Sequence, residues 1–135
     1  MTLEWINFVP RGDERGVLVA IESGRDVPFE IKRIYTLHGL HPGAVRGGHA
    51  HKVLRQVIVC LSGSCLIDLD DGRSTQSVPL DDPARGLVLA PMVWHEMRAF
   101  SPGCVLMVLA AAHYDEADYI RDRAEFLKRA KAVSA

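Results

Sequence analysis

The chain has 135 residues, 48% of them hydrophobic, and its 16 basic residues nearly balance its 17 acidic ones. This length suits one domain with a buried core, so we expect a single domain over residues 1–135. The longest apolar runs, residues 57–61 and 105–112, fall far below the roughly 20 residues of a membrane-spanning helix. Because no signal peptide or basic, aromatic-rich surface is evident, we expect a cytoplasmic protein that binds neither membrane nor nucleic acid.

Short runs of β-branched and aromatic residues, each ending in turn residues, follow one another through most of the chain. They cover residues 17–21, 31–37, 55–61, 65–69 and 87–90. Several strands at this spacing are typical of an antiparallel sandwich or barrel. The turns at Ser62-Gly63-Ser64 and Asp71-Gly72, the second a dipeptide favoured in two-residue hairpins, predict a β-meander in the middle of the chain.

The pattern changes after residue 110. Asp115 is a residue type that caps helices, and the apolar residues that follow recur near helical spacing at Tyr119, Ile120, Phe126, Leu127 and Ala130. We therefore expect one C-terminal helix, packed on the outside of the barrel. Three cysteines, Cys60, Cys65 and Cys104, lie in apolar runs without a CxxC spacing, which predicts buried free thiols in a reducing compartment.

The candidate chemistry centres on two histidines, His49 and His51, which are separated by one residue. On a strand, side chains two residues apart point to the same face. If that face lines a barrel, both imidazoles enter one cavity, where they could bind a metal or exchange protons near neutral pH. The alternative is a pair of exposed loop histidines.

The spacing around this pair resembles the cupin motifs. Gly43-x5-His49-x-His51-x4-Gln56-x6-Gly63 matches the first motif, G-x5-H-x-H-x4-E-x6-G, except that Gln56 replaces the glutamate. Gly86-x4-Pro91-x3-His95 resembles a shortened second motif, which delivers a third histidine. Gln56 lacks the negative charge that the glutamate gives a metal site, so it disfavours a metal without eliminating one.

Longer segments resemble the nucleotide-sugar 3,4-ketoisomerases, which are cupins acting on dTDP-4-keto-6-deoxyglucose. The resemblance rests on the segments at residues 15–22, 31–35, 46–52, 93–97 and 113–121, and it spans nearly the whole chain. It implies an all-β cupin, or jelly-roll antiparallel β-barrel, with a short C-terminal helix. It further implies a homodimer with exchanged N-terminal strands, no cofactor, and a place in deoxyamino-sugar biosynthesis for a lipopolysaccharide, an S-layer glycan or a glycosylated metabolite.

The implied reaction passes through an enediol: a base removes the C3 proton of the sugar and a proton returns at C4. An imidazole near its ordinary pKa both accepts and donates protons at pH 7. We predict His51 as the base and His49 as its partner, although the residues themselves do not divide the two roles. The resemblance adds Tyr35 as a catalytic residue, and it implies a substrate-binding set of Arg46, Arg15, Arg33, Gln56, Trp94 and His95. Among the arginines, Arg46 is the preferred pyrophosphate ligand.

Three alternatives remain open from the sequence: a nucleotide-sugar 3,5-epimerase, a metal-dependent cupin oxygenase, and a non-catalytic module that binds sugar nucleotides. The configuration at C4 of the product, galacto or gluco, is also open. Thr36 and Gly48 depart from the residues usual in the resembling family, and we expect them to reshape the sugar pocket.

Overall fold

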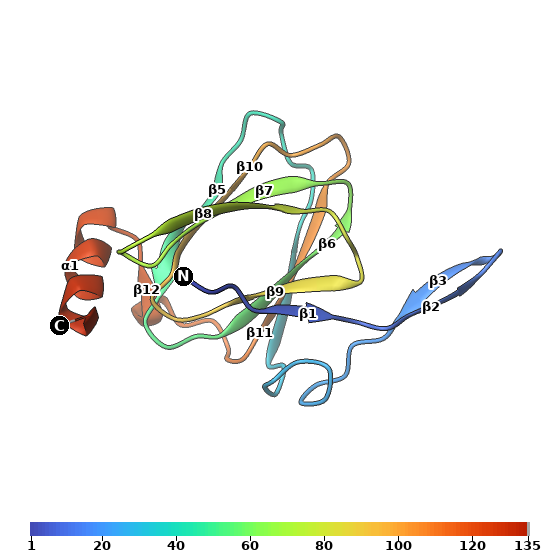
Figure 1. The fold of residues 1–135 in the computed structure, drawn as a ribbon, viewed down its shortest axis with the longest axis horizontal. Helices are drawn as coiled ribbons and strands as arrows, with labels where there is room; N and C mark the ends of the chain where they lie inside the picture. Colours follow the sequence, from blue (N-terminus) through green and yellow to red (C-terminus); the bar gives the residue numbers. More distant parts are fainter. Residues whose placement is uncertain (135) are drawn as a thin grey trace.

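The computed structural model describes residues 1–134, which form two five-stranded sheets facing each other (Figure 1). One sheet has the order β1 (Trp5–Asn7), β9 (Arg85–Leu89), β6 (Gln56–Ser62), β11 (Val105–Ala110) and β4 (Arg33–Leu37). The other has the order β12 (Tyr119–Ile120), β5 (Arg46–His51), β10 (Trp94–Arg98), β7 (Cys65–Asp70) and β8 (Thr75–Leu80). The strand pairs in both sheets are antiparallel. The predicted all-β jelly-roll architecture is therefore confirmed.

Apolar side chains from both sheets fill much of the space between them. Ile58, Ile67 and Leu106 are completely buried there, and burial of such a side chain is worth about 1.5–3 kcal/mol. The three cysteines lie in the same core as free thiols. Burial raises the pKa of both Cys60 and Cys65 to about 12. The prediction of buried free thiols is confirmed.

The predicted meander is wrong. β6 pairs with β9 and β11, whereas β7 pairs with β8 and β10. The turn at Gly63 therefore carries the chain from one sheet to the other, and hydrogen bonds between Ser64 and Ser101 hold it there. The β7–β8 hairpin does form, but through the longer turn 71–74, in which the Asp71 carboxylate accepts from the N–H groups of Arg73 and Ser74.

The C-terminal segment also differs from the expectation. Asp115 caps only the 3₁₀ helix η1 (Glu116–Asp118), and the next two residues pair with β5 as strand β12. The helix α1 (Arg123–Ser134) begins later than expected, because pairing with a sheet edge overrides the helical spacing of Tyr119 and Ile120. Phe126 and Ala130 are buried against Trp94, so the predicted packing of a helix on the outside of the barrel is confirmed.

A separate two-stranded hairpin, β2 (Pro10–Asp13) with β3 (Gly16–Val19), extends away from the barrel at the end opposite α1 (Figure 1). Its apolar residues Val17 and Leu18 are 70% and 60% exposed. Within residues 1–134, no helix has the length and hydrophobicity that a bilayer crossing requires.

Candidate active site

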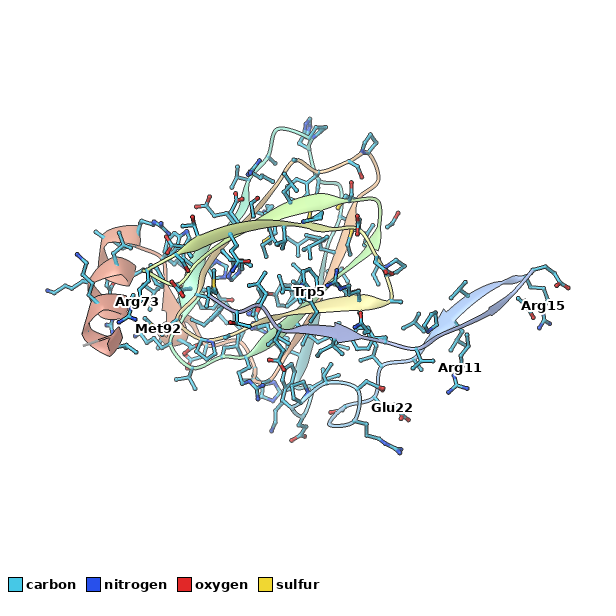
Figure 2. All side chains as sticks on the ribbon, in the orientation of Figure 1. Trp5, Arg11, Arg15, Glu22, Arg73 and Met92 are labelled. Carbon is cyan, nitrogen blue, oxygen red and sulfur yellow. The ribbon has the colours of Figure 1, made fainter. Side chains whose placement is uncertain are left out.

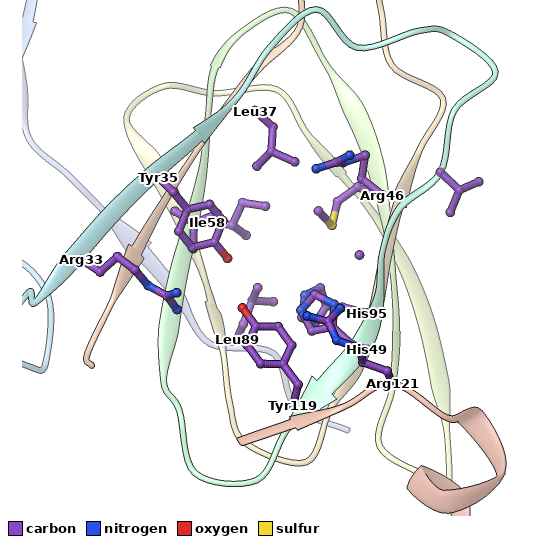
Figure 3. A pocket seen from close by; sticks show the side chains of 14 residues that line it. Arg33, Tyr35, Leu37, Arg46, His49, Ile58, Leu89, His95, Tyr119 and Arg121 are labelled. Atoms are coloured by element: carbon purple, nitrogen blue, oxygen red, sulfur yellow. The ribbon is translucent and has the colours of Figure 1, made fainter. Parts of the chain in front are cut away.

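A cavity of about 430 Å³ opens between the two sheets (Figure 3). One part of its wall is apolar and includes Leu37, Ile58 and Met97. The other part is polar, and its side chains come from both sheets and from the segment after η1. These polar residues are Arg33, Tyr35, Arg46, His49, His95, Tyr119 and Arg121. The cavity thus has the mixed lining that is typical of small-molecule sites.

Strand geometry brings the three motif histidines together. His49 and His51 share one face of β5, and their ring centroids are 5.0 Å apart. His95 on β10 is the cross-strand partner of His49, at 4.7 Å between ring centroids. Gly47, at φ +87°, allows the close approach of these strands, since a Cβ there would lie 2.8 Å from the His95 carbonyl oxygen. The expectation that the second motif delivers a third histidine is confirmed.

Burial keeps this cluster uncharged at neutral pH. Burial, together with the neighbouring His51 imidazole, lowers the pKa of His49 to about 4. Burial and the neighbouring histidines lower the pKa of His95 to about 3. Both rings are therefore neutral bases at pH 7. Neither ring nitrogen of His49 makes a hydrogen bond of standard geometry within the described residues, although the nearby Gly47 backbone opposes the lowering of its pKa. The His49 ring can therefore accept a proton from a bound molecule.

His51 has different surroundings. Its Nδ1 lies 3.1 Å from Asp118 Oδ2, and its Nε2 lies 3.2 Å from the Gln56 amide nitrogen. The Tyr35 hydroxyl donates to Gln56 Oε1 at 2.9 Å. His51 and Gln56 do not line this cavity. Gln56 lies behind Tyr35, to which it is hydrogen-bonded, and His51 lines a second, neighbouring cavity that shares Arg33 and Tyr119 with the first.

The arginines differ in their pairing. Arg33 lines the cavity with its guanidinium near Tyr35 (Figure 3), and its buried Nε and Nη2 have no hydrogen-bond partner within residues 1–134. Arg46 is exposed on the cavity rim. Arg121 forms an ion pair with Glu116 at 2.6 Å and stacks on Tyr119 at 4.3 Å. Because a buried cation without a partner is costly, Arg33 is the arginine best prepared to receive an anion.

Two residues expected to bind substrate lie away from the cavity. Trp94 alternates with His95 along β10, so its ring points the other way and packs on Phe126 beneath α1. Arg15 is at the tip of the hairpin (Figure 2), where it pairs with Asp13 and its side chain is 85% exposed. The stacking role expected for Trp94 is therefore corrected to a packing role, and Arg15 does not reach the cavity of its own chain. Gln56 is corrected to an indirect position behind Tyr35.

Other residues of the site were not predicted. Tyr119 lines the cavity and contacts the rings of His49 and His51, with centroids 4.9 and 4.3 Å apart. Arg121 and Asp118 come from the same short segment. The sequence carried one signal for them, because all three belong to the family-like stretch 113–121. The expectation of a helix there concealed the short strand β12, which places Tyr119 beside the histidines of β5. Gly48, in turn, is at φ +77° with open space around a hypothetical Cβ.

The family model and the relatives that share more than 40% of their sequence with the chain indicate one kind of enzyme. The family model described as "FdtA: WxcM-like, C-terminal" matches residues 1–131. The chain is 54% identical over 123 residues to the TDP-4-oxo-6-deoxy-α-D-glucose-3,4-oxoisomerase of Aneurinibacillus thermoaerophilus, covering 91% of this chain and 88% of that protein.

Two solved structures of QdtA, a sugar 3,4-ketoisomerase from Thermoanaerobacterium thermosaccharolyticum, are also similar. The complex with TDP has a TM-score of 0.96 and 41% identity, over 98% of this chain and 97% of that one. A variant in complex with TDP-4-keto-6-deoxyglucose has a TM-score of 0.95 and 42% identity, over 96% and 94%. A 3′-monoepimerase from Streptomyces bikiniensis shares the fold, with a TM-score of 0.73. The match covers 87% of this chain and 67% of that one, and the sequence identity is only 18%.

Proposed function

Since the chain belongs to the FdtA, WxcM-like family and is an isomerase of the sugar 3,4-ketoisomerase type, we propose that it converts TDP-4-keto-6-deoxyglucose to a TDP-3-keto-6-deoxyhexose. The curated relative is named for this oxoisomerisation, and a QdtA variant has been solved with the same 4-keto sugar. The observation in this chain that carries the proposal is the neutral, unpartnered His49 on the wall of the cavity.

In the proposed mechanism, a ring nitrogen of His49 takes the proton from C3 of the sugar. The electrons of the broken C–H bond form the C3–C4 double bond, and the C4 oxygen gains a proton, which gives an enediol. The C3 hydroxyl then loses its proton as the carbonyl forms at C3, and the imidazolium of His49 returns a proton to C4. Tyr35 and Tyr119, whose hydroxyls point into the same space (Figure 3), are positioned to assist the oxygen-to-oxygen transfer.

This mechanism exchanges the roles first predicted for the two histidines. Both ring nitrogens of His51 face protein groups, Asp118 and the Gln56 amide, whereas those of His49 have no partner among the described residues. A general base must reach the proton that it removes. We therefore assign the base to His49 and an orienting role to His51.

The nucleotide diphosphate is proposed to bind at Arg33, with Arg46 and Arg121 nearer the rim. An arginine offers several N–H donors in one plane, which suits a phosphate oxygen pair. The buried, unpaired atoms of Arg33 support this assignment over the earlier preference for Arg46. His95, in contact with the His49 ring, is proposed to hold that ring in place.

We also propose that two copies of the chain form a homodimer by exchanging their N-terminal strands. The projecting hairpin supports this arrangement, because Val17 and Leu18 leave apolar surface exposed that a second copy would cover. Exchange would also carry Arg15 toward the partner's barrel. A cytoplasmic location and a role in supplying a deoxyamino sugar for a lipopolysaccharide or S-layer glycan remain predictions.

Proton NMR of the reaction products tests the proposed reaction against its rivals. A ketoisomerase gives a new product whose carbonyl has moved from C4 to C3. A 3,5-epimerase instead keeps the C4 carbonyl and inverts a ring centre, and a binding module leaves the 4-keto sugar unchanged while still binding TDP. Activity that is lost with a chelator, together with stoichiometric metal by elemental analysis, would favour the oxygenase alternative.

A further inference from the structure

We propose that Asp118 is a positioning residue of the isomerisation, which fixes the tautomer of His51 and, through Gln56, sets the Tyr35 hydroxyl as a hydrogen-bond acceptor toward the sugar. The inference rests on the proposed function, because it gives Tyr35 a defined part in the proton transfer. It involves four side chains that come from four separate strands or turns: Asp118, His51, Gln56 and Tyr35.

The carboxylate of Asp118 is held in place from three directions. Oδ1 accepts from the Val53 backbone N–H at 2.9 Å, and Oδ2 accepts from the Leu54 N–H at 3.2 Å and faces His51 Nδ1 at 3.1 Å. A carboxylate oxygen can only accept hydrogen bonds. His51 must therefore carry a hydrogen on Nδ1.

The protonation of the second ring nitrogen of His51, Nε2, follows from that of Nδ1. Burial lowers the pKa of His51 although the Asp118 carboxylate opposes this change, so the ring is neutral at pH 7 and carries one hydrogen. With that hydrogen on Nδ1, Nε2 has only its lone pair. The groups that surround the ring and carry charge or titrate are Asp118, Arg33, Arg121, His49, His95 and Tyr119.

The lone pair on Nε2 sets the direction of the remaining hydrogen bonds. It accepts from the Gln56 NH₂ group at 3.2 Å, which turns Gln56 Oε1 toward Tyr35. That oxygen accepts the Tyr35 hydroxyl hydrogen at 2.9 Å. The Tyr35 proton is thus held by the protein, and burial keeps it there by raising the pKa of Tyr35 to about 12.

The consequence for the reaction concerns the two sugar oxygens. With its own hydrogen directed to Gln56, Tyr35 offers only lone pairs to the cavity, so it accepts a hydrogen bond from the sugar hydroxyl at C3. It does not donate to the carbonyl at C4. The donor to the carbonyl must come from another group, and Tyr119 is the other hydroxyl on the cavity wall.

The position of Gln56 explains why an amide suits this site better than the glutamate of metal cupins. An amide donates with one end and accepts with the other, so it can transmit direction from His51 to Tyr35. A carboxylate at the same place would accept from both neighbours. His51 would then need hydrogens on both ring nitrogens, between two carboxylates.

The test compares Asp118→Asn with Asp115→Asn, with every assay run in chelator. Asp115 lies in the same segment, where it caps η1 through Ala117, and asparagine also caps helices. In Asp118→Asn, the amide has one acceptor oxygen instead of two, so it cannot accept from Val53, Leu54 and His51 together. When its oxygen keeps the Val53 hydrogen bond, its NH₂ group faces His51 and favours the tautomer with hydrogen on Nε2, which reverses the direction of the hydrogen bonds to Gln56 and Tyr35. For Asp118→Asn we expect kcat to fall at least tenfold, while the dissociation constant for TDP changes less than twofold. For the control Asp115→Asn we expect the wild-type kcat and dissociation constant.

The tautomer of His51, measured by long-range ¹H–¹⁵N NMR, separates the two interpretations of Asp118. If Asp118 served only to stabilise the fold, its substitution would leave this tautomer unchanged. Wild type should show hydrogen on Nδ1, and Asp118→Asn should show it on Nε2. Gln56→Glu provides an independent variant, including the case in which Asp118→Asn does not fold, and it should raise the pKa of His51 and lower kcat.

The proposal is overturned if wild-type His51 carries its hydrogen on Nε2, or if Gln56→Glu leaves both the His51 pKa and kcat unchanged. A wild-type enzyme that makes no 3-keto sugar would instead refute the proposed function, whatever the tautomer.

Discussion

His49 and His51 show how two identical side chains on one strand acquire different chemistry. Their spacing places both on one face of β5, yet His51 is 4% exposed and bonded at both nitrogens, whereas His49 lies on the cavity wall without a partner among the described residues. The difference arises from residues distant in sequence, Asp118 above all. Its place on the cavity wall and its lack of a side-chain partner therefore identify His49 as the proposed base.

The pH dependence of kcat/KM should report the state of His49. The base must be neutral to accept a proton, and burial lowers its pKa from 6.5 to about 4. We therefore expect kcat/KM to hold from pH 7 down to about pH 5 and to fall as the pH approaches 4, because protonation then removes the base. Rates measured on TDP-4-keto-6-deoxyglucose, with circular dichroism at each pH to verify folding, would check this. A half-maximal loss near pH 6.5 would contradict it.

Arg33 should contribute more than Arg46 to nucleotide binding. A hydrogen bond to a charged group contributes about 1.5–3 kcal/mol, so Arg33→Gln should weaken TDP binding by roughly 10- to 100-fold in calorimetry, and exposed Arg46 should matter less. Arg129→Gln is a suitable control, because that arginine pairs with Glu125 on α1, away from the cavity. If Arg33→Gln bound TDP as tightly as the wild type, Arg33 would not be part of the nucleotide-binding site.

At the level of elements, the short segment from η1 through β12 to α1 completes the site. β12 pairs with β5 beside the histidines and carries Tyr119, η1 ends on Asp118, and α1 holds this segment against the barrel through Phe126. The helix therefore stabilises part of the cavity wall, although no residue of α1 lines the cavity.

Phe126→Ala should consequently destabilise the fold. The side chain is completely buried beneath α1, and truncation of such a phenylalanine costs about 3–5 kcal/mol. Chemical denaturation would measure the loss, with Val133→Ala as a control because Val133 is 75% exposed on the same helix. A loss below about 1 kcal/mol would show that α1 contributes little to stability.

The strands predicted from runs of β-branched residues did not include β5 and β10, which carry the motif histidines. The meeting of these histidines was indicated by the cupin-like spacing alone, which is a local property of the sequence. The spacing of His49, His51 and His95 depends only on strands and one turn. Pairing between strands is not local: nothing in the residues around Gly63 distinguishes a hairpin from a crossing between sheets, and the partner that decides it, Ser101, lies far along the chain. Tyr119 and Asp118 were missed for the same reason, since their positions depend on the pairing of β12 with β5.

At the level of the whole molecule, the β2–β3 hairpin projects from the barrel, and the packing of a single barrel gives no reason for its exposed apolar side chains. It projects from the end opposite α1 (Figure 1) and buries little of its apolar surface. Exchange between two copies would cover this surface and bring Arg15 to the partner. This interpretation connects the exposed apolar surface of the hairpin with the proposed dimer.

Leu18→Asp should therefore shift the protein from dimer to monomer in sedimentation equilibrium, because a carboxylate in an apolar interface is costly to desolvate. Val53→Asp, which replaces a residue 76% exposed on the barrel rather than on the hairpin, should leave the association unchanged. A wild-type chain that is monomeric at micromolar concentration would contradict the exchange.

The central claim is that this chain moves a carbonyl along a sugar with His49 as the base. The most direct test is proton NMR of TDP-4-keto-6-deoxyglucose with wild type and with His49→Gln, each first shown to bind TDP equally. Wild type should yield the 3-keto sugar, and His49→Gln should do so roughly 100- to 10,000-fold more slowly, which is the usual range for loss of a general base. Conversion by His49→Gln at the wild-type rate would contradict the account.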